Sequence, residues 1–268
     1  MDKEKLKKLA EDPRFIPGIY NYCDRWCERC PFTSRCMNYA LSEDEFDSTE
    51  SKDINNQAFW DKLHGVFQVT LEMVKESAEE MGIDLNAIDH EELAKQEKLV
   101  HKKVKEQPCT KAAFAYVEIV SKWFDSNTDL LKSKADELLT LAQAEIPAAS
   151  PDSDALKIQD YLEIIRWYQH QIYVKLCRAA SGMIRGELEE AEYFPQDANG
   201  SAKVAILGIE RSIAAWGGLL QQFPDQENPI LDVLVALKKL LRQVDAAFPE
   251  ARAFVRPGFD ALKEPDDK

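Results

Sequence analysis

The spacing of apolar residues constrains the fold of this chain more than any other feature of its sequence. Over residues 55–81, apolar side chains recur at steps of three and four residues: Phe59, Leu63, Phe67, Leu71, Val74 and Ala78. Such steps place the side chains on one face of an α-helix, because the helix turns once in 3.6 residues. Alternation of the strand type is scarce, and glycine, at 10 of 268 residues, has about half of its usual share. The sequence therefore predicts an all-α protein.

The same spacing, and the residues that interrupt it, predict where the helices lie. The predicted helices cover residues 2–11, 55–81, 86–106, 109–145, 154–186, 201–222 and 229–247. Gly82 has the residue type that often follows the end of a helix. The Ser-Asn-Thr run at 126–128 divides 109–145 into two helices or kinks a single one. Residues 187–200 are predicted to form a loop, because they contain Pro195 and an Asn-Gly pair.

Composition divides the chain into four parts. Residues 1–41 are predicted to form a cysteine-rich metal-binding segment. Residues 42–54 are acidic and have few large apolar side chains, so we expect them to form an exposed linker. Residues 55–255 hold helices whose apolar stripes can be buried against one another, and 256–268 form a polar tail that we expect to be frayed. We therefore expect a multi-helix bundle with an independent N-terminal four-cysteine metal-binding loop segment. The alternative is that the aromatic residues of the segment plug the bundle and share its core.

Four of the six cysteines lie close together in the sequence. Cys23, Cys27, Cys30 and Cys36 have the spacing C-x3-C-x2-C-x5-C. Short spacings bring several sulfur ligands together through local turns, and thiolates repel one another unless a cation lies among them. We therefore predict that these four residues bind a metal centre. A 4Fe-4S cluster is favoured, because compact four-cysteine loops commonly hold one.

Other interpretations of the four cysteines stay open. A structural zinc ion is the main alternative, although zinc sites usually consist of two cysteine pairs separated by a longer stretch. A redox dithiol and four unligated thiols are the remaining ones. Even a genuine cluster can have the purely structural role of tying the aromatic segment together. The other two cysteines, Cys109 and Cys177, stand alone in helical contexts and are interpreted as packing thiols.

Part of the cysteine stretch resembles the iron–sulfur cluster loop of the helix-hairpin-helix DNA glycosylases. The residues that carry the resemblance are Cys27, Cys30, Pro31 and Cys36. The family loop reads C-x6-C-x2-C-x5-C, often with proline after the third cysteine, whereas the first gap here has three residues. The resemblance implies a 4Fe-4S cluster held by cysteines, but not glycosylase activity, because we recognise no helix-hairpin-helix outside the loop. The spacing is also similar to that of the auxiliary-cluster domains of radical enzymes, whose α/β barrel this helical pattern does not offer.

The charge of the chain bears on its partners and its location. Asp and Glu number 48 against 34 Lys and Arg, which gives a formal net charge of −14. A field of that sign repels nucleic acid and anionic lipid, so we expect a protein partner, with no nucleic acid and no membrane. No run of apolar residues approaches the roughly 20 that span a bilayer, and residues 1–11 lack the apolar stretch of a secretory signal. We therefore expect a cytoplasmic protein with reduced thiols.

These observations support three functional hypotheses. In the first, the protein is a redox or sensor module with a four-cysteine iron–sulfur cluster. In the second, the site holds structural zinc and the acidic helical body is a scaffold for protein interactions. In the third, the protein is an enzyme whose polar site lies inside the helical bundle. The candidate residues for that polar site are His64, Glu118, His170 and Glu210.

Overall fold

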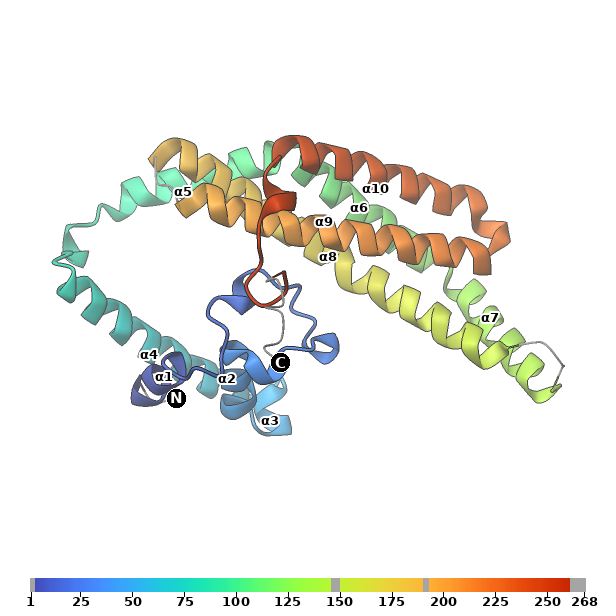
Figure 1. The fold of residues 1–268 in the computed structure, drawn as a ribbon, viewed down its shortest axis with the longest axis horizontal. Helices are drawn as coiled ribbons and strands as arrows, with labels where there is room; N and C mark the ends of the chain where they lie inside the picture. The colour runs from blue at the N-terminus through green and yellow to red at the C-terminus, as the bar shows by residue number, and fades with distance from the viewer. Residues whose placement is uncertain (1–2, 146–149, 190–192, 261–268) are drawn as a thin grey trace, which may run out of the picture. The chain divides into compact units, whose positions relative to one another are not determined.

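The computed structural model describes residues 3–145, 150–189 and 193–260. Throughout these ranges the regular secondary structure is helical, and no β-strand occurs in them (Figure 1). The predicted all-α class is thereby confirmed. None of the helices in these ranges is both long enough and apolar enough to cross a membrane.

The chain divides into two compact units, and both ends of the chain belong to the first. Unit 1 comprises residues 1–97 and 255–268, and unit 2 comprises 98–254. This division differs from the predicted boundary near residue 54. The helix predicted at 55–81 belongs to the unit that contains the four cysteines, instead of to the helical bundle.

Unit 2 consists of long helices packed side by side. Its elements are the second half of α5 (His90–Glu106), α6 (Pro108–Ser126), α7 (Thr128–Gln143), α8 (Pro151–Glu189), α9 (Tyr193–Gln222), η5 (Pro224–Gln226), α10 (Glu227–Ala247) and η6 (Ala251–Ala253). Helix α9 lies against α8 and α10, and α6 packs on both α8 and α10 (Figure 1). Residues 109–145 thus form two helices, which a turn at Asn127 separates. The Asn127 side-chain amide donates to the carbonyl oxygen of Trp123 (2.8 Å) and fixes that turn.

Large aromatic side chains fill the centre of unit 2. Trp216 is fully buried, and its ring meets that of Trp123 edge to face, with the centroids 5.0 Å apart. The Trp216 indole N–H donates to the hydroxyl oxygen of Tyr116 (3.2 Å). Burial raises the pKa of Tyr116 to about 12, so this phenol stays neutral at ordinary pH. Unit 2 therefore has the well-filled apolar core that a helical bundle needs.

Helices α8 and α9 approach each other closely at Gly208. A Cβ atom at this position would lie 2.8 Å from the ring of Tyr168 and 3.2 Å from Ile172, and both of these side chains are fully buried. Further along α9, a Cβ atom at Gly217 would meet nothing within 4 Å. Gly208 is therefore required by helix packing, whereas Gly217 is not.

The start of α9 corrects one prediction. Residues 187–200 are predicted to form a loop, but α8 extends to Glu189 and α9 begins at Tyr193, while 190–192 lie outside the described residues. Pro195 is the third residue of α9. Proline is tolerated there, because the first backbone N–H groups of a helix have no partner within the helix.

Unit 1 has shorter elements and a thin core. Its elements are α1 (Lys3–Ala10), η1 (Ile19–Asn21), η2 (Cys27–Arg29), η3 (Thr33–Arg35), α2 (Met37–Glu45), α3 (Thr49–Lys52), α4 (Gln57–Glu80), η4 (Leu85–Ala87) and the first half of α5. Among its described residues, Ile19 and Ala78 are the only buried apolar side chains. An ion pair between Lys3 and Glu76 joins α1 to α4. Gly82 follows α4 with a φ of 68°, as its residue type predicts.

The predicted acidic linker at 42–54 is largely helical. It contains the end of α2 and all of α3, and α3 packs against α4. Ser48 begins α3 with a reciprocal cap: Ser51 N–H donates to Ser48 Oγ (3.1 Å), and Ser48 N–H donates to Ser51 Oγ (3.0 Å). Glu45 and Ser51 are both buried. The local cap and the packing on α4 override the acidic composition, so the stretch is helical instead of an irregular linker, although most of its residues are exposed as expected.

The apolar face predicted for 55–81 forms a helix but is not buried. Phe67, Leu71 and Val74 are 58%, 59% and 52% exposed, and in this face only Ala78 is buried. The expectation that this stripe packs within the bundle is therefore wrong for α4. The physical reason is that α4 belongs to unit 1, whose described helices contact α4 mainly through the short helix α3.

The start of the predicted frayed tail is ordered. Phe259 meets the ring of Phe32 edge to face, with the centroids 5.1 Å apart. Arg256 and Asp260 form an ion pair (2.9 Å), and Gly258 has a φ of 77° and lies against Ile19. Residues 256–260 are therefore part of unit 1, because their apolar side chains supply cover that its thin core lacks; the rest of the predicted tail, 261–268, lies outside the described residues.

Candidate metal centre

The four cysteines lie in a segment of short turns between α1 and α2. Cys27 begins η2, and the backbone N–H of Cys30 donates to the carbonyl oxygen of Cys27 (3.1 Å). Cys36 follows η3, and its N–H donates to the carbonyl oxygen of Thr33 (3.2 Å). One 3-10 turn therefore lies between Cys27 and Cys30, and another lies between Cys30 and Cys36.

A third turn lies between the first two cysteines. Arg25 has a φ of 60°, in the left-handed region that residues other than glycine rarely adopt. The Trp26 N–H donates to Oδ1 of Asp24 (3.2 Å), which supports the same turn. Left-handed backbone of this kind costs roughly 1–2 kcal/mol. This turn allows both Cys23 and Cys27 to reach one cavity.

All four cysteines line that cavity, which we call the cysteine cavity. Its volume is about 20 Å³, and all four side chains are free thiols of intermediate exposure. Aromatic residues form much of its wall: Tyr20, Trp26, Phe32, Tyr39 and Phe259. The structure thus brings together the four residues that the spacing predicts as ligands, in surroundings that limit the access of water.

The surroundings of Cys27 and Cys30 favour the protonated form of these two thiols in the absence of a cation. Burial raises the pKa of Cys27, and its neighbours Cys23 and Cys36 raise it further. Burial also raises the pKa of Cys30, with a smaller contribution from Cys23 in the same direction. Thiolates at these positions therefore repel one another unless a cation lies among them. A soft metal cation would relieve that repulsion by taking the place of the thiol protons.

Hydrogen bonds to sulfur orient two of the thiols. The backbone N–H of Phe32 points at Sγ of Cys30 (3.4 Å) and partly opposes the rise in its pKa. The Sγ of Cys23 donates to the carbonyl oxygen of Tyr20 (3.6 Å). Arg25 lines the cavity, and the guanidinium of Arg29 lies over the ring of Trp26, 4.1 Å from its centroid. The two hydrogen bonds involve Sγ of Cys23 and Sγ of Cys30, and the stacking of Arg29 on Trp26 supports one wall of the cavity.

The sulfurs share a cavity but do not converge on one point. Among the described residues, no three His, Cys, Asp or Glu side chains form a group that could hold a single metal ion. Zinc requires thiolates about 2.3 Å from one centre. The cavity has space for roughly one water-sized sphere. The chemistry of the donor set fits a soft metal centre, and the turns that carry the sulfurs must adjust to bind it.

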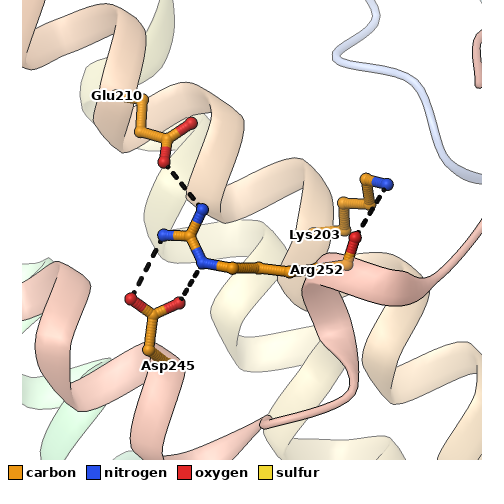
Figure 2. Close-up of polar contacts among 4 residues, drawn as sticks. All are labelled: Lys203, Glu210, Asp245 and Arg252. Carbon is orange, nitrogen blue, oxygen red and sulfur yellow. Dashed lines mark hydrogen bonds and ion pairs between the residues drawn. The ribbon is translucent and has the colours of Figure 1, made fainter.

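The residues proposed for a polar site inside the bundle are not interior. Glu118, His170 and Glu210 in unit 2 are exposed, as is His64 on α4 of unit 1. Figure 2 shows Glu210 beside Arg252, whose guanidinium donates to it (3.0 Å). The structure therefore assigns Glu210 to a surface ion-pair cluster.

That cluster is structural in character. Arg252 also donates to both carboxylate oxygens of Asp245 (2.7 and 3.1 Å), and Lys203 Nζ donates to the Arg252 carbonyl oxygen (3.2 Å) (Figure 2). The hydrogen bonds that Arg252 donates raise its pKa above its already high value. The bond to Asp245 has the larger effect, and the bond to Glu210 has the next largest. The contacts join η6 to α9 and α10, and they hold the guanidinium permanently charged.

Sequence reasoning missed Phe259 as part of the site. Phe259 lies in a stretch that reads as a polar tail, far along the chain from the cysteines. No local pattern predicts a contact at that separation. The only signal was the large aromatic side chain of Phe259 in a largely polar segment.

Comparisons with known proteins add no relative. No family model matches the chain, and neither a curated protein nor a solved structure matches it significantly. The functional argument therefore depends on the residues and geometry of the chain itself.

Proposed function

We propose that the protein is an iron–sulfur protein in which Cys23, Cys27, Cys30 and Cys36 hold a 4Fe-4S cluster that acts as a redox or sensing centre. The observation that carries the proposal is that four thiols of one compact loop line a single cavity with aromatic walls. When bound, such a cluster accepts and returns one electron, and oxidants can alter it. The surroundings of the cluster determine whether it transfers electrons or responds to oxidants.

The chain contributes to this function through the groups around the sulfurs. The Phe32 N–H that points at Cys30 Sγ stabilises negative charge on that sulfur, and hydrogen bonds of this kind tune the reduction potential of a cluster. The aromatic side chains Trp26, Phe32 and Phe259 limit the access of water and of small oxidants. We expect the turns at η2 and η3 to open slightly on binding, because the cavity is smaller than a cluster.

The thin core of unit 1 favours a second candidate function. Among the described residues of unit 1, Ile19 and Ala78 are the only buried apolar side chains, so its core contributes little to stability. A bound metal can supply the stability that such a core lacks. A zinc ion held by the same four cysteines would serve that purpose. The acidic helical body would then be a scaffold for protein interactions.

In either case we expect the partner to be a protein and the setting to be cytoplasmic. The net charge of −14 favours a partner with a basic surface and opposes binding to nucleic acid or to an anionic membrane. For the redox function, that partner would exchange electrons with the cluster.

Metal analysis of anaerobically purified protein tests the proposal. We expect about four iron and four acid-labile sulfide per chain, absorption near 400 nm, and an electron paramagnetic resonance signal after reduction with dithionite. Reversible reduction supports a redox role. Colourless protein with about one zinc per chain would overturn the iron–sulfur proposal in favour of the structural zinc site.

Two cysteine variants show whether the metal occupies the proposed site. Cys30→Ser should abolish cluster binding, because an alkoxide is a poor ligand for soft metals. Cys177→Ser is the matched control, since Cys177 is a free thiol in unit 2, and it should retain full metal content. Full iron occupancy in Cys30→Ser would remove Cys30 from the site.

A further inference from the structure

Helix α4 carries an apolar stripe that is exposed except at Ala78 and that continues to Met81, the residue after the helix. The α4 stripe consists of five side chains whose exposed fractions run from 48% to 68%: Trp60, Phe67, Leu71, Val74 and Met81. Together with His64 and Ala78, these positions alternate steps of three and four residues over three heptads. This is the repeat by which one helix packs along another in a coiled coil.

A contiguous apolar stripe of this kind is uncommon on a monomeric protein and marks an interaction surface. The exposed apolar side chains described in unit 2 do not offer a matching repeat. On α8 they are Leu156, Val174 and Leu188, several turns apart, and on α10 they are Leu231 and Val235, a single pair. The other helices add Phe114 and Ile119 on α6, which are five residues apart, and the single residues Leu99 on α5 and Leu139 on α7. Within the described residues, the surface that matches the repeat of α4 is α4 itself. A second copy of the chain would therefore offer a complementary helix.

We propose that α4 pairs with α4 of a second copy, antiparallel, around a two-fold axis. A two-fold interface is reciprocal, so each contact occurs twice. Aligning Phe67 with Leu71 of the second copy, and Leu71 with its Phe67, brings the two heptad repeats into register. His64 then lies opposite Val74 of the second copy, at the edge of the central apolar layers.

Charges beside the stripe select the antiparallel orientation. Asp61 and Lys75 flank the α4 stripe at equivalent heptad positions, one near each end. Asp61 accepts a hydrogen bond from Gln57 (2.9 Å), but neither Asp61 nor Lys75 forms an ion pair within the described chain. In the antiparallel alignment Asp61 meets Lys75 of the second copy, twice. In a parallel pair Lys75 would instead lie beside Thr70, and no such attraction would form.

Sedimentation equilibrium of the full-length, metal-loaded protein tests the proposal. The wild-type protein should show a monomer–dimer equilibrium with a dissociation constant in the micromolar range, the weak end for interfaces of ordinary size. Leu71→Glu should weaken the dimer at least about 100-fold, because it places a charge in the central layer. Val235→Glu is the matched control, since Val235 is 68% exposed on α10, and it should leave the equilibrium unchanged. A wild-type protein that stays monomeric up to about 100 µM overturns the proposal, as does a dimer that survives Leu71→Glu.

Charge reversal tests the orientation with variants that do not disturb the fold. Asp61→Lys and Lys75→Asp should each weaken the dimer about three- to tenfold at low salt, because each replaces two attractions by two repulsions. The double variant, Asp61→Lys with Lys75→Asp, should restore the wild-type dissociation constant to within about threefold. Single variants without effect, or a double variant as weak as the singles together, would overturn the antiparallel alignment.

Discussion

The two units of the molecule are stabilised in different ways. Unit 2 buries large side chains such as Trp216, Tyr168 and Leu176 among long helices. Unit 1 has only Ile19 and Ala78 as buried apolar side chains among its described residues, and it exposes the apolar stripe of α4. A helical pattern in the sequence therefore does not guarantee a core. Unit 1, whose core is thin, is the unit that contains the four cysteines and the helix with an exposed apolar face.

The largest effect of a single substitution is expected in the core of unit 2. Trp216→Ala should lower the free energy of unfolding of unit 2 by about 3–5 kcal/mol, because it removes a fully buried ring and leaves a cavity beside Trp123. The matched change in unit 1 is Trp60→Ala, where the side chain is 48% exposed, and it should cost less than about 1 kcal/mol. Urea denaturation followed by circular dichroism measures both. Equal losses of stability for the two variants would contradict the difference between the core of unit 2 and that of unit 1.

Substitutions at two glycines of α9 test how closely α8 and α9 approach each other in unit 2. Gly208→Ala should destabilise unit 2 by about 1–2 kcal/mol, because the new Cβ lies against the buried ring of Tyr168 and the overpacking outweighs the gain in helix propensity. Gly217→Ala should stabilise it by up to about 1 kcal/mol, since the same gain comes without a contact. Thermal melts that shift in the same direction for both would contradict the close approach of α8 and α9.

A smaller effect is expected from pH on the metal-free form of unit 1. The folded state raises the pKa of the Cys27 and Cys30 thiols, chiefly through burial, so folding favours their protonated form. The stability that this contributes is fully present below the pKa of the unfolded thiol, about 8.5, and is lost as the pH rises through the higher folded value. We expect a loss of less than about 1 kcal/mol between pH 7 and pH 10, because both thiols are partly exposed.

Hydrogen exchange of peptides from residues 12–41 at the two pH values, corrected for the intrinsic exchange rate, measures this loss. The metal-loaded protein is the control, and it should lack the dependence, because its thiolates hold no protons. Protection of the metal-free form that increases with pH would show that the sign is wrong.

Most helices of this chain could be predicted from apolar spacing and from single capping residues. The prediction for 55–81 gave α4 at Gln57–Glu80, and Gly82 adopts the positive φ that its position implied. The helices at 42–54 and 193–200 were missed for a common reason. Serine, proline and acidic residues favour turns on average, but a reciprocal Ser48–Ser51 cap and a proline in the first turn of α9 are compatible with helix.

The candidate site was predictable only in part. Spacing was sufficient to single out Cys23, Cys27, Cys30 and Cys36, because residues that local turns bring together are also close in the sequence. Phe259 reaches the same cavity from the other end of the chain, and periodicity contains no information on such contacts. For the same reason the apolar face of α4 could be located in the sequence, whereas its exposure could not.

The central claim is that a metal held by the four cysteines stabilises unit 1 in place of a large apolar core, and hydrogen exchange measured by mass spectrometry tests it most directly. The measurement compares metal-loaded protein with the same protein stripped of metal by a chelator under reducing conditions. We predict that amides in residues 12–97 lose protection at least about 100-fold on metal removal, while those in 98–254 keep theirs, because the unit 2 core is complete without it. Unchanged protection of residues 12–97 in the metal-free protein would contradict the account, and so would an equal loss in both units.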